Sequence, residues 1–343
     1  MSVWRAAVIA AASLSLAACG GGGTSSSTPG VVTPPSPLPP PPPPPPPAPP
    51  PPPPPSGPQR YSDEVFSQTA RQSDVAFGEA DRSYGKQTLR MDIYTPVGDG
   101  ETERPVFILA FPGGFVEGDR RDPDLVDIAE SLARRGYVTA SIDYRLFEGS
   151  PSTPDEIDIA IIEAMHDMRA AVRFLREDAL GPDTYGTRPD KIFVGGMSAG
   201  GVMASFAGAL DARDGVSTAV RNFLDAHNGI AGDSSTNTAI SSDIQGVFSI
   251  SGGITDFLWI DMNTAPIYAA HEEYDPTVPC YYGLGDAGIS LAGGCDMVQL
   301  AQSFGVQAEL YLVAGASTHL EFTPEQTAAY INGASAFFAG LLE

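Results

Sequence analysis

Residues 191–200 read Lys-Ile-Phe-Val-Gly-Gly-Met-Ser-Ala-Gly, and this stretch decides the fold of the chain. The apolar run at 191–195 predicts a buried strand. The pattern Gly-x-Ser-x-Gly follows at 196–200, and an Ala- and Gly-rich segment that predicts a helix comes next. Small residues around Ser198 allow the tight turn that exposes a hydroxyl group between a strand and a helix. Alone the pattern is weak, because glycine and serine are common here, but its strand–turn–helix setting makes Ser198 a candidate nucleophile.

The segments around this stretch alternate between short apolar runs and longer runs of helical periodicity. Such alternation predicts an α/β protein with a mostly parallel sheet. We expect strands at 73–77, 89–94, 106–111, 137–143, 191–195, 245–250, 265–270 and 308–313, the first two antiparallel, and helices at 124–135, 157–176, after 198 and at 323–342. The longest polar insert, 211–242, is either a small lid or a long loop.

The composition limits the class of protein and of partner. Residues 59–343 suit one large α/β domain better than two small ones. The net charge is −23, from 19 basic and 42 acidic residues. Nucleic acid and anionic lipid both require a positive surface, so this charge argues against them as main partners. A neutral small molecule or a neutral polymer fits the charge better as a substrate.

The N-terminus carries a targeting signal. Arg5 precedes an Ala-rich apolar stretch at 6–18 that is too short to span a bilayer. The stretch ends in Leu-Ala-Ala-Cys-Gly at 16–20, which resembles the bacterial lipobox, whose cysteine becomes lipidated. We therefore expect residues 1–18 to be a lipoprotein signal peptide and Cys19 to carry a lipid anchor.

A spacer follows the expected anchor. Residues 20–33 are rich in Gly, Ser and Thr, and residues 34–55 are almost pure proline. Proline fixes φ and removes backbone donors, so this tract predicts an extended polyproline II rod of roughly 70 Å. We interpret residues 19–58 as a stalk, and a ligand for proline-binding modules is the alternative. The protein is then an exported bacterial lipoprotein with a periplasmic or extracellular domain. Gly20 after the cysteine, in place of the Asp that retains lipoproteins in the inner membrane of enterobacteria, favours the outer membrane.

Cys280 and Cys295 are the other two cysteines of the chain. Export to an oxidising compartment favours a disulfide between them, worth roughly 3 kcal/mol for a loop of this length. Two buried thiols are the alternative. Neither a Cys-x-x-Cys pair nor paired histidines accompany them, so no metal site is expected.

A serine nucleophile needs a base, and the chain has four histidines, at 166, 227, 271 and 319. In folds with this strand–turn–helix nucleophile, the chain order is Ser, then acid, then His. His319 follows the last predicted strand, and only His319 leaves room for an acid at a separate strand end. We predict His319 as the general base.

The acid is expected on the loop after the strand that precedes the His319 strand. Asp275 fits, within His-Glu-Glu-Tyr-Asp-Pro-Thr-Val-Pro at 271–279, where it would orient the imidazole. Asp256, Asp286 and Asp296 are rivals. Two backbone N–H groups should stabilise the oxyanion, one from Ala199 and one from Gly113 or Gly114 in the loop after the 106–111 strand.

Several segments in order resemble the α/β-hydrolase superfamily, in its carboxylesterase/lipase branch, which includes hormone-sensitive-lipase-like and feruloyl-esterase-like enzymes. They are Leu-Arg-Met-Asp-Ile-Tyr-Thr-Pro at 89–96, Ile-Asp-Tyr-Arg-Leu at 142–146 and Asp-Pro-Thr-Val-Pro at 275–279. The resemblance spans residues 73–343. It implies an eight-stranded, mostly parallel sheet with helices on both faces. One departure is Phe-Pro-Gly-Gly at 111–114, where the family usually has His-Gly-Gly-Gly.

The sequence thus predicts a serine hydrolase that cleaves carboxylic esters with the triad Ser198, Asp275 and His319, and without metal or organic cofactor. A serine peptidase of the prolyl-oligopeptidase type is the first alternative, against which the lack of a propeller-sized N-terminal domain counts. A non-catalytic surface protein on the same fold is the second. The presence of all three triad residues disfavours it.

Overall fold

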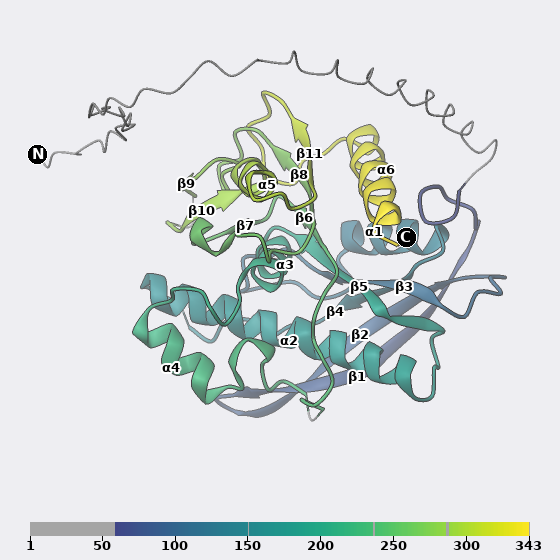
Figure 1. Ribbon diagram of the computed structural model, residues 1–343, viewed down its shortest axis with the longest axis horizontal. Helices are drawn as coiled ribbons and strands as arrows, with labels where there is room; N and C mark the ends of the chain where they lie inside the picture. Colours follow the sequence, from purple (N-terminus) through teal and green to yellow (C-terminus); the bar gives the residue numbers. More distant parts are fainter. Residues whose placement is uncertain (1–58, 150, 236, 286–287, 343) are drawn as a thin grey trace, which may run out of the picture. The chain divides into compact units, whose positions relative to one another are not determined.

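The central sheet has eight strands (Figure 1). In spatial order they are β1 (Thr69–Arg82), β2 (Gly85–Pro96), β4 (Val138–Ile142), β3 (Arg104–Ala110), β5 (Thr187–Met197), β6 (Val247–Ile250), β8 (Ile267–Glu272) and β11 (Ala308–Val313). Strand β2 is antiparallel to both of its neighbours, and β4, β3, β5, β6, β8 and β11 run parallel to one another. The predicted fold class and eight strand positions are confirmed.

This computed structural model describes residues 59–343 except 150, 236, 286–287 and 343. The predicted signal peptide, Cys19, the stalk and the rival acid Asp286 lie outside the described residues. In the part of the chain that the structure describes, no helix is long and apolar enough to cross a bilayer.

Helices cover both faces of the sheet. Helices α1 (Pro123–Arg134) and α6 (Pro324–Gly340) pack beside each other, and α2 (Pro154–Leu180) and α3 (Ala199–Ala209) form a second pair (Figure 1). The ring of Phe193 on β5 lies 4.9 Å from that of Phe338 on α6. Since side chains alternate along a strand, Val194 points to the opposite face.

Helix α2 is longer than its apolar periodicity predicted, because its first turn is specified by polar residues. Thr153 caps the helix by accepting the Glu156 N–H, and the Glu156 carboxylate accepts the Thr153 N–H in return. Pro154 occupies the first turn, where its missing N–H costs nothing. A Thr323–Gln326 pair starts α6 in the same way.

Short elements of the C-terminal half were not predicted. A three-stranded sheet contains β7 (Gly253–Ile254), β10 (Ser290–Gly293) and β9 (Gly283–Leu284). Helix α5 (Gly294–Ser303) packs against β8 and β11. Strands of two to four residues are too short for an alternating pattern to be visible in the sequence.

The 211–242 insert contains helix α4 (Thr218–Ala226) and the 3-10 turn η1 (Gly229–Ala231). Three arginines of α2 hold the second half of this insert and the residue after it. Arg169, Arg173 and Arg176 donate to the carbonyl oxygens of Ser242, Ala231 and Asp243, respectively. No described residue of 211–242 lines the pocket at Ser198. In this structure the insert packs along α2 through α4 and η1.

Candidate active site

Ser198 lies on a sharp turn between β5 and α3. Its backbone has φ 49° and ψ −116°, a strained conformation for a residue with a side chain, and its N–H donates to the Ile250 carbonyl at 2.9 Å. The turn depends on close backbone approach, since a Cβ atom at Gly200 would lie 2.2 Å from the Ala110 carbonyl oxygen. The glycines that made the motif recognisable are therefore required by the packing of α3 on β3.

The structure brings Ser198, His319 and Asp275 into one hydrogen-bonded chain. The Ser198 Oγ lies 2.8 Å from the His319 Nε2, and the His319 Nδ1 lies 2.7 Å from the Asp275 Oδ2. A carboxylate accepts hydrogen bonds but does not donate them, so the proton resides on Nδ1 and Nε2 accepts from the serine. The imidazole is 18% exposed, whereas the carboxyl is buried. This arrangement can remove the proton from a serine hydroxyl.

The second oxygen of Asp275 is held by the backbone. Its Oδ1 accepts the N–H groups of Thr277 at 2.8 Å and Val278 at 3.0 Å. The two alternative acids that the structure describes accept other backbone N–H groups instead. Asp256 accepts the Leu258 N–H, and Asp296 accepts the Tyr282 N–H.

The other three histidines lie apart from the serine hydroxyl. His166 is buried in α2, and burial lowers its pKa to about 3. His227 pairs with Asp233 on the surface. His271 is buried, its Nε2–H donates to the Val278 carbonyl at 2.8 Å, and its Nδ1 accepts the Gly294 N–H. Burial lowers the pKa of His271, so it braces the Asp275 loop as a neutral ring.

The loop after β3 presents its backbone to Ser198. Gly113, Gly114 and Phe115 all have positive φ, at 118°, 59° and 63°. Gly114 and Ala199 line the same pocket as Ser198, whereas Gly113 does not and instead accepts N–H groups from the turn that follows it. A Cβ at Gly113 would lie 2.1 Å from the Glu117 carbonyl oxygen, so Gly113 shapes the turn. Of the two predicted glycines, Gly114 is the one that lines the pocket at Ser198.

Tyr144 supports this loop at Phe111, the position where the resembled family usually has a histidine. Its ring stacks on Phe111 at a centroid distance of 4.2 Å, and its hydroxyl donates to the Phe111 carbonyl at 3.0 Å. Burial raises the pKa of Tyr144, so the hydroxyl stays protonated and can donate. The sequence prediction did not identify this role, although Tyr144 lies in one of the segments that resembled the family.

Glu272 holds the loop that carries His319. Its buried carboxyl accepts four hydrogen bonds, from the hydroxyls of Ser251 and Thr318 and the N–H groups of Leu320 and Glu321. Leu320, the residue after the histidine, has φ 61°. The carboxyl therefore stabilises a strained backbone directly beside the imidazole. The sequence prediction did not identify this residue either.

A disulfide joins Cys280 and Cys295, with their Cα atoms 5.0 Å apart. It closes the segment that contains β9 and β10 and that follows the Asp275 loop. Among the described residues, no group of three or more His, Cys, Asp or Glu side chains is arranged to hold a metal ion.

A family model described as BD-FAE matches residues 91–232. The matched region runs from β2 to η1 and contains Gly113, Gly114 and Ser198, and it ends before Asp275 and His319. No curated protein matches the chain.

Solved structures share the fold. Esterase 2 of Thermogutta terrifontis phosphoramylated by tabun has a TM-score of 0.58 at 17% identity, with 81% of this chain and 96% of that one covered. The propionate-bound form of that esterase gives 0.56 at 18% identity, with 78% and 94% covered. A truncated carbohydrate esterase from gut microbiota gives 0.56 at 16% identity, with 81% and 97% covered. The family match and the shared fold confirm the resemblance predicted from the sequence.

Proposed function

We infer that the chain, an α/β hydrolase of the carboxylesterase branch, cleaves carboxylic esters through an acyl-enzyme on Ser198. The observation that carries this inference is the continuous hydrogen-bonded chain from Ser198 through His319 to Asp275. The matching structures include esterases with organophosphorus groups or short carboxylates bound, which supports an acyl-transfer site on this fold.

The mechanism follows from the geometry. His319 Nε2 takes the proton of Ser198 as its Oγ attacks the ester carbonyl, and the N–H groups of Gly114 and Ala199 stabilise the negative oxygen. The C–O bond to the alcohol then breaks, and the imidazolium returns its proton to the leaving alkoxide. Water, deprotonated by His319, attacks the acyl-enzyme and releases the acid. Asp275 keeps the proton on Nδ1 and stabilises the imidazolium throughout.

Turnover of paired substrates tests this function. The purified protein should hydrolyse p-nitrophenyl butyrate, and Ser198→Ala should lower kcat/KM by about a thousandfold or more. Ser303→Ala is the matched control, because Ser303 is an exposed serine on α5 whose loss should leave turnover unchanged. Hydrolysis of the matching anilide but not the ester would instead indicate a peptidase. No turnover of either would favour the non-catalytic alternative.

We also propose that Cys19 is lipidated, that residues 34–55 form a stalk, and that the domain lies outside the cytoplasm. The Leu-Ala-Ala-Cys-Gly segment and the proline tract support this proposal. Expression in bacteria fed an alkyne-tagged fatty acid should label the protein and place it in the membrane fraction. Cys19→Ser should lose both properties, and a label that persists in this variant would contradict the anchor.

A further inference from the structure

A small apolar pocket opens beside Ser198. Besides Ser198, Gly114 and Ala199, its walls include the side chains of Phe115, Phe147, Ile157, Ile161, Val202 and Leu291. Its volume is about 90 Å³. Because nearly all of its wall is hydrocarbon, it suits a hydrocarbon chain rather than a polar group.

The position of the pocket indicates which half of an ester it holds. The two proposed oxyanion donors line it, whereas His319 is not among the described residues that do. The leaving alcohol must reach His319 Nε2 to receive a proton, so the alcohol departs outside this pocket. The acyl chain is therefore the half of the ester that enters.

The volume sets a limit on chain length. A methylene group occupies roughly the 30 Å³ that a water molecule takes in the liquid. A pocket of about 90 Å³ then accommodates about three carbon atoms beyond the carbonyl. Acetyl, propionyl and butyryl groups fit, and longer linear chains exceed the volume of the pocket.

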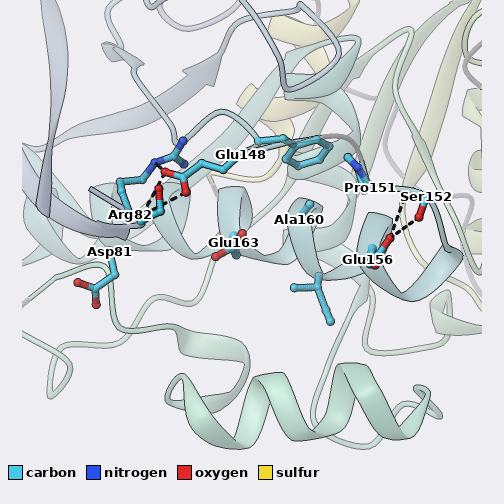
Figure 2. Close-up of a pocket in the computed structure, with 11 residues that line it drawn as sticks. Asp81, Arg82, Glu148, Pro151, Ser152, Glu156, Ala160 and Glu163 are labelled. Carbon is cyan, nitrogen blue, oxygen red and sulfur yellow. Dashed lines mark hydrogen bonds and ion pairs between the residues drawn. The ribbon is translucent and has the colours of Figure 1, made fainter. Parts of the chain in front are cut away.

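Phe147 forms one wall of the pocket. Its ring stacks on Phe115 at a centroid distance of 5.2 Å, and its N–H donates to the Phe115 carbonyl at 2.8 Å. Phe147 also lines a second cavity of about 560 Å³, which is bordered by Arg82, Glu148 and Glu163 (Figure 2). Phe147 is the residue that the linings of these two spaces share.

We propose that Phe147 sets the acyl specificity of this enzyme and restricts it to esters of short acids, of up to about four carbons. This inference rests on the proposed esterase function and names its substrate class. Phe147→Ala removes the ring, enlarges the pocket toward the second cavity, and extends the accepted chain to six or eight carbons. The carboxylates that border the second cavity disfavour still longer alkyl chains.

The experiment is a profile of kcat/KM over p-nitrophenyl esters of two, four, six, eight and ten carbons. The unaltered protein should prefer the two- and four-carbon esters to the eight-carbon ester by about tenfold or more. Phe147→Ala should raise the ratio of eight-carbon to four-carbon turnover by about tenfold or more, and Phe147→Trp should lower it. Ile159→Ala, which alters only the wall of the second cavity, should keep the original ratio.

Two results would overturn the inference while leaving the proposed function intact. One is a preference of the unaltered protein for six carbons or more, and the other is an unchanged ratio in a folded Phe147→Ala protein. If Phe147→Ala does not fold, the same ratio of eight-carbon to four-carbon turnover is measured in Phe147→Leu. Absence of ester turnover together with absence of fluorophosphonate labelling would overturn the proposed function itself, and this inference with it.

Discussion

At the scale of single residues, the site depends on side chains outside the triad that hold the triad in place. Glu272 is the strongest example, because one buried carboxyl accepts four hydrogen bonds and two of them come from the backbone that follows His319. A displacement of about 1 Å in a catalytic group can cost on the order of a hundredfold in rate. Because Glu272 holds the backbone directly after His319, we expect its loss to displace the imidazole and to slow the reaction.

We predict that Glu272→Gln lowers kcat/KM by at least about tenfold and the free energy of unfolding by about 1–3 kcal/mol. A glutamine amide offers one accepting oxygen and turns an NH2 group toward donors that already point inward. Ester turnover and urea denaturation measure the two effects. Glu309→Gln removes the same charge from an exposed position on β11 and is the control. Equal activity in the two variants would show that Glu272 does not position His319.

A second prediction concerns the loop that carries Gly114. Tyr144→Phe removes the hydroxyl that donates to the Phe111 carbonyl and should lower the free energy of unfolding by about 1 kcal/mol, with a lower kcat. Tyr137→Phe is a matched control, because the buried Tyr137 hydroxyl has no hydrogen-bond partner among the described residues. Its removal should leave stability unchanged or raise it. Identical losses in both variants would argue against a specific role for Tyr144.

Residues such as Tyr144 and Glu272 could not be assigned from the sequence. Tyr144 acts on a carbonyl 33 residues away, and Glu272 on N–H groups 48 and 49 residues away. Such contacts depend on the packing of separate loops, which leaves no spacing pattern. Ser198 differs because its motif is local, and His319 and Asp275 differ because chain order limits the candidates.

At the scale of elements, the disulfide-closed segment 280–295 connects stability with the site. It carries β9 and β10, and Ile289 and Leu291 within it line the acyl pocket. The two cysteines were predicted as a pair from the expected compartment, but β9 and β10 were missed because strands of two to four residues show no periodicity. Helices with strong periodicity, such as α1, were predicted to within two residues.

Loss of this bridge should destabilise the fold. The double variant Cys280→Ser with Cys295→Ser should lower the free energy of unfolding by roughly 3 kcal/mol, because the unfolded chain regains the freedom of a 15-residue loop. Guanidinium denaturation with and without a reductant checks this. The reductant should shift the unaltered protein toward the variant and leave the variant unmoved. An unaltered protein that does not respond to reductant after full reduction would contradict a stabilising bridge.

At the scale of the whole molecule, four distant segments meet because the strands before them are parallel. Gly114 follows β3, Ser198 follows β5, Asp275 follows β8 and His319 follows β11. The carboxyl ends of parallel strands lie at one edge of a sheet, so side chains and N–H groups placed after them converge. This rule allowed the constellation to be predicted from the sequence. The acyl pocket could not be predicted, since its walls come from α2, α3 and several loops.

The most direct test of the central claim is the mass of the protein after reaction with a fluorophosphonate. We predict one adduct, located on the peptide that contains Ser198, and its absence in Ser198→Ala. His319→Ala should slow the reaction by about a thousandfold, because the serine then lacks its base. An adduct that persists in Ser198→Ala, or that maps to another serine, would contradict the account.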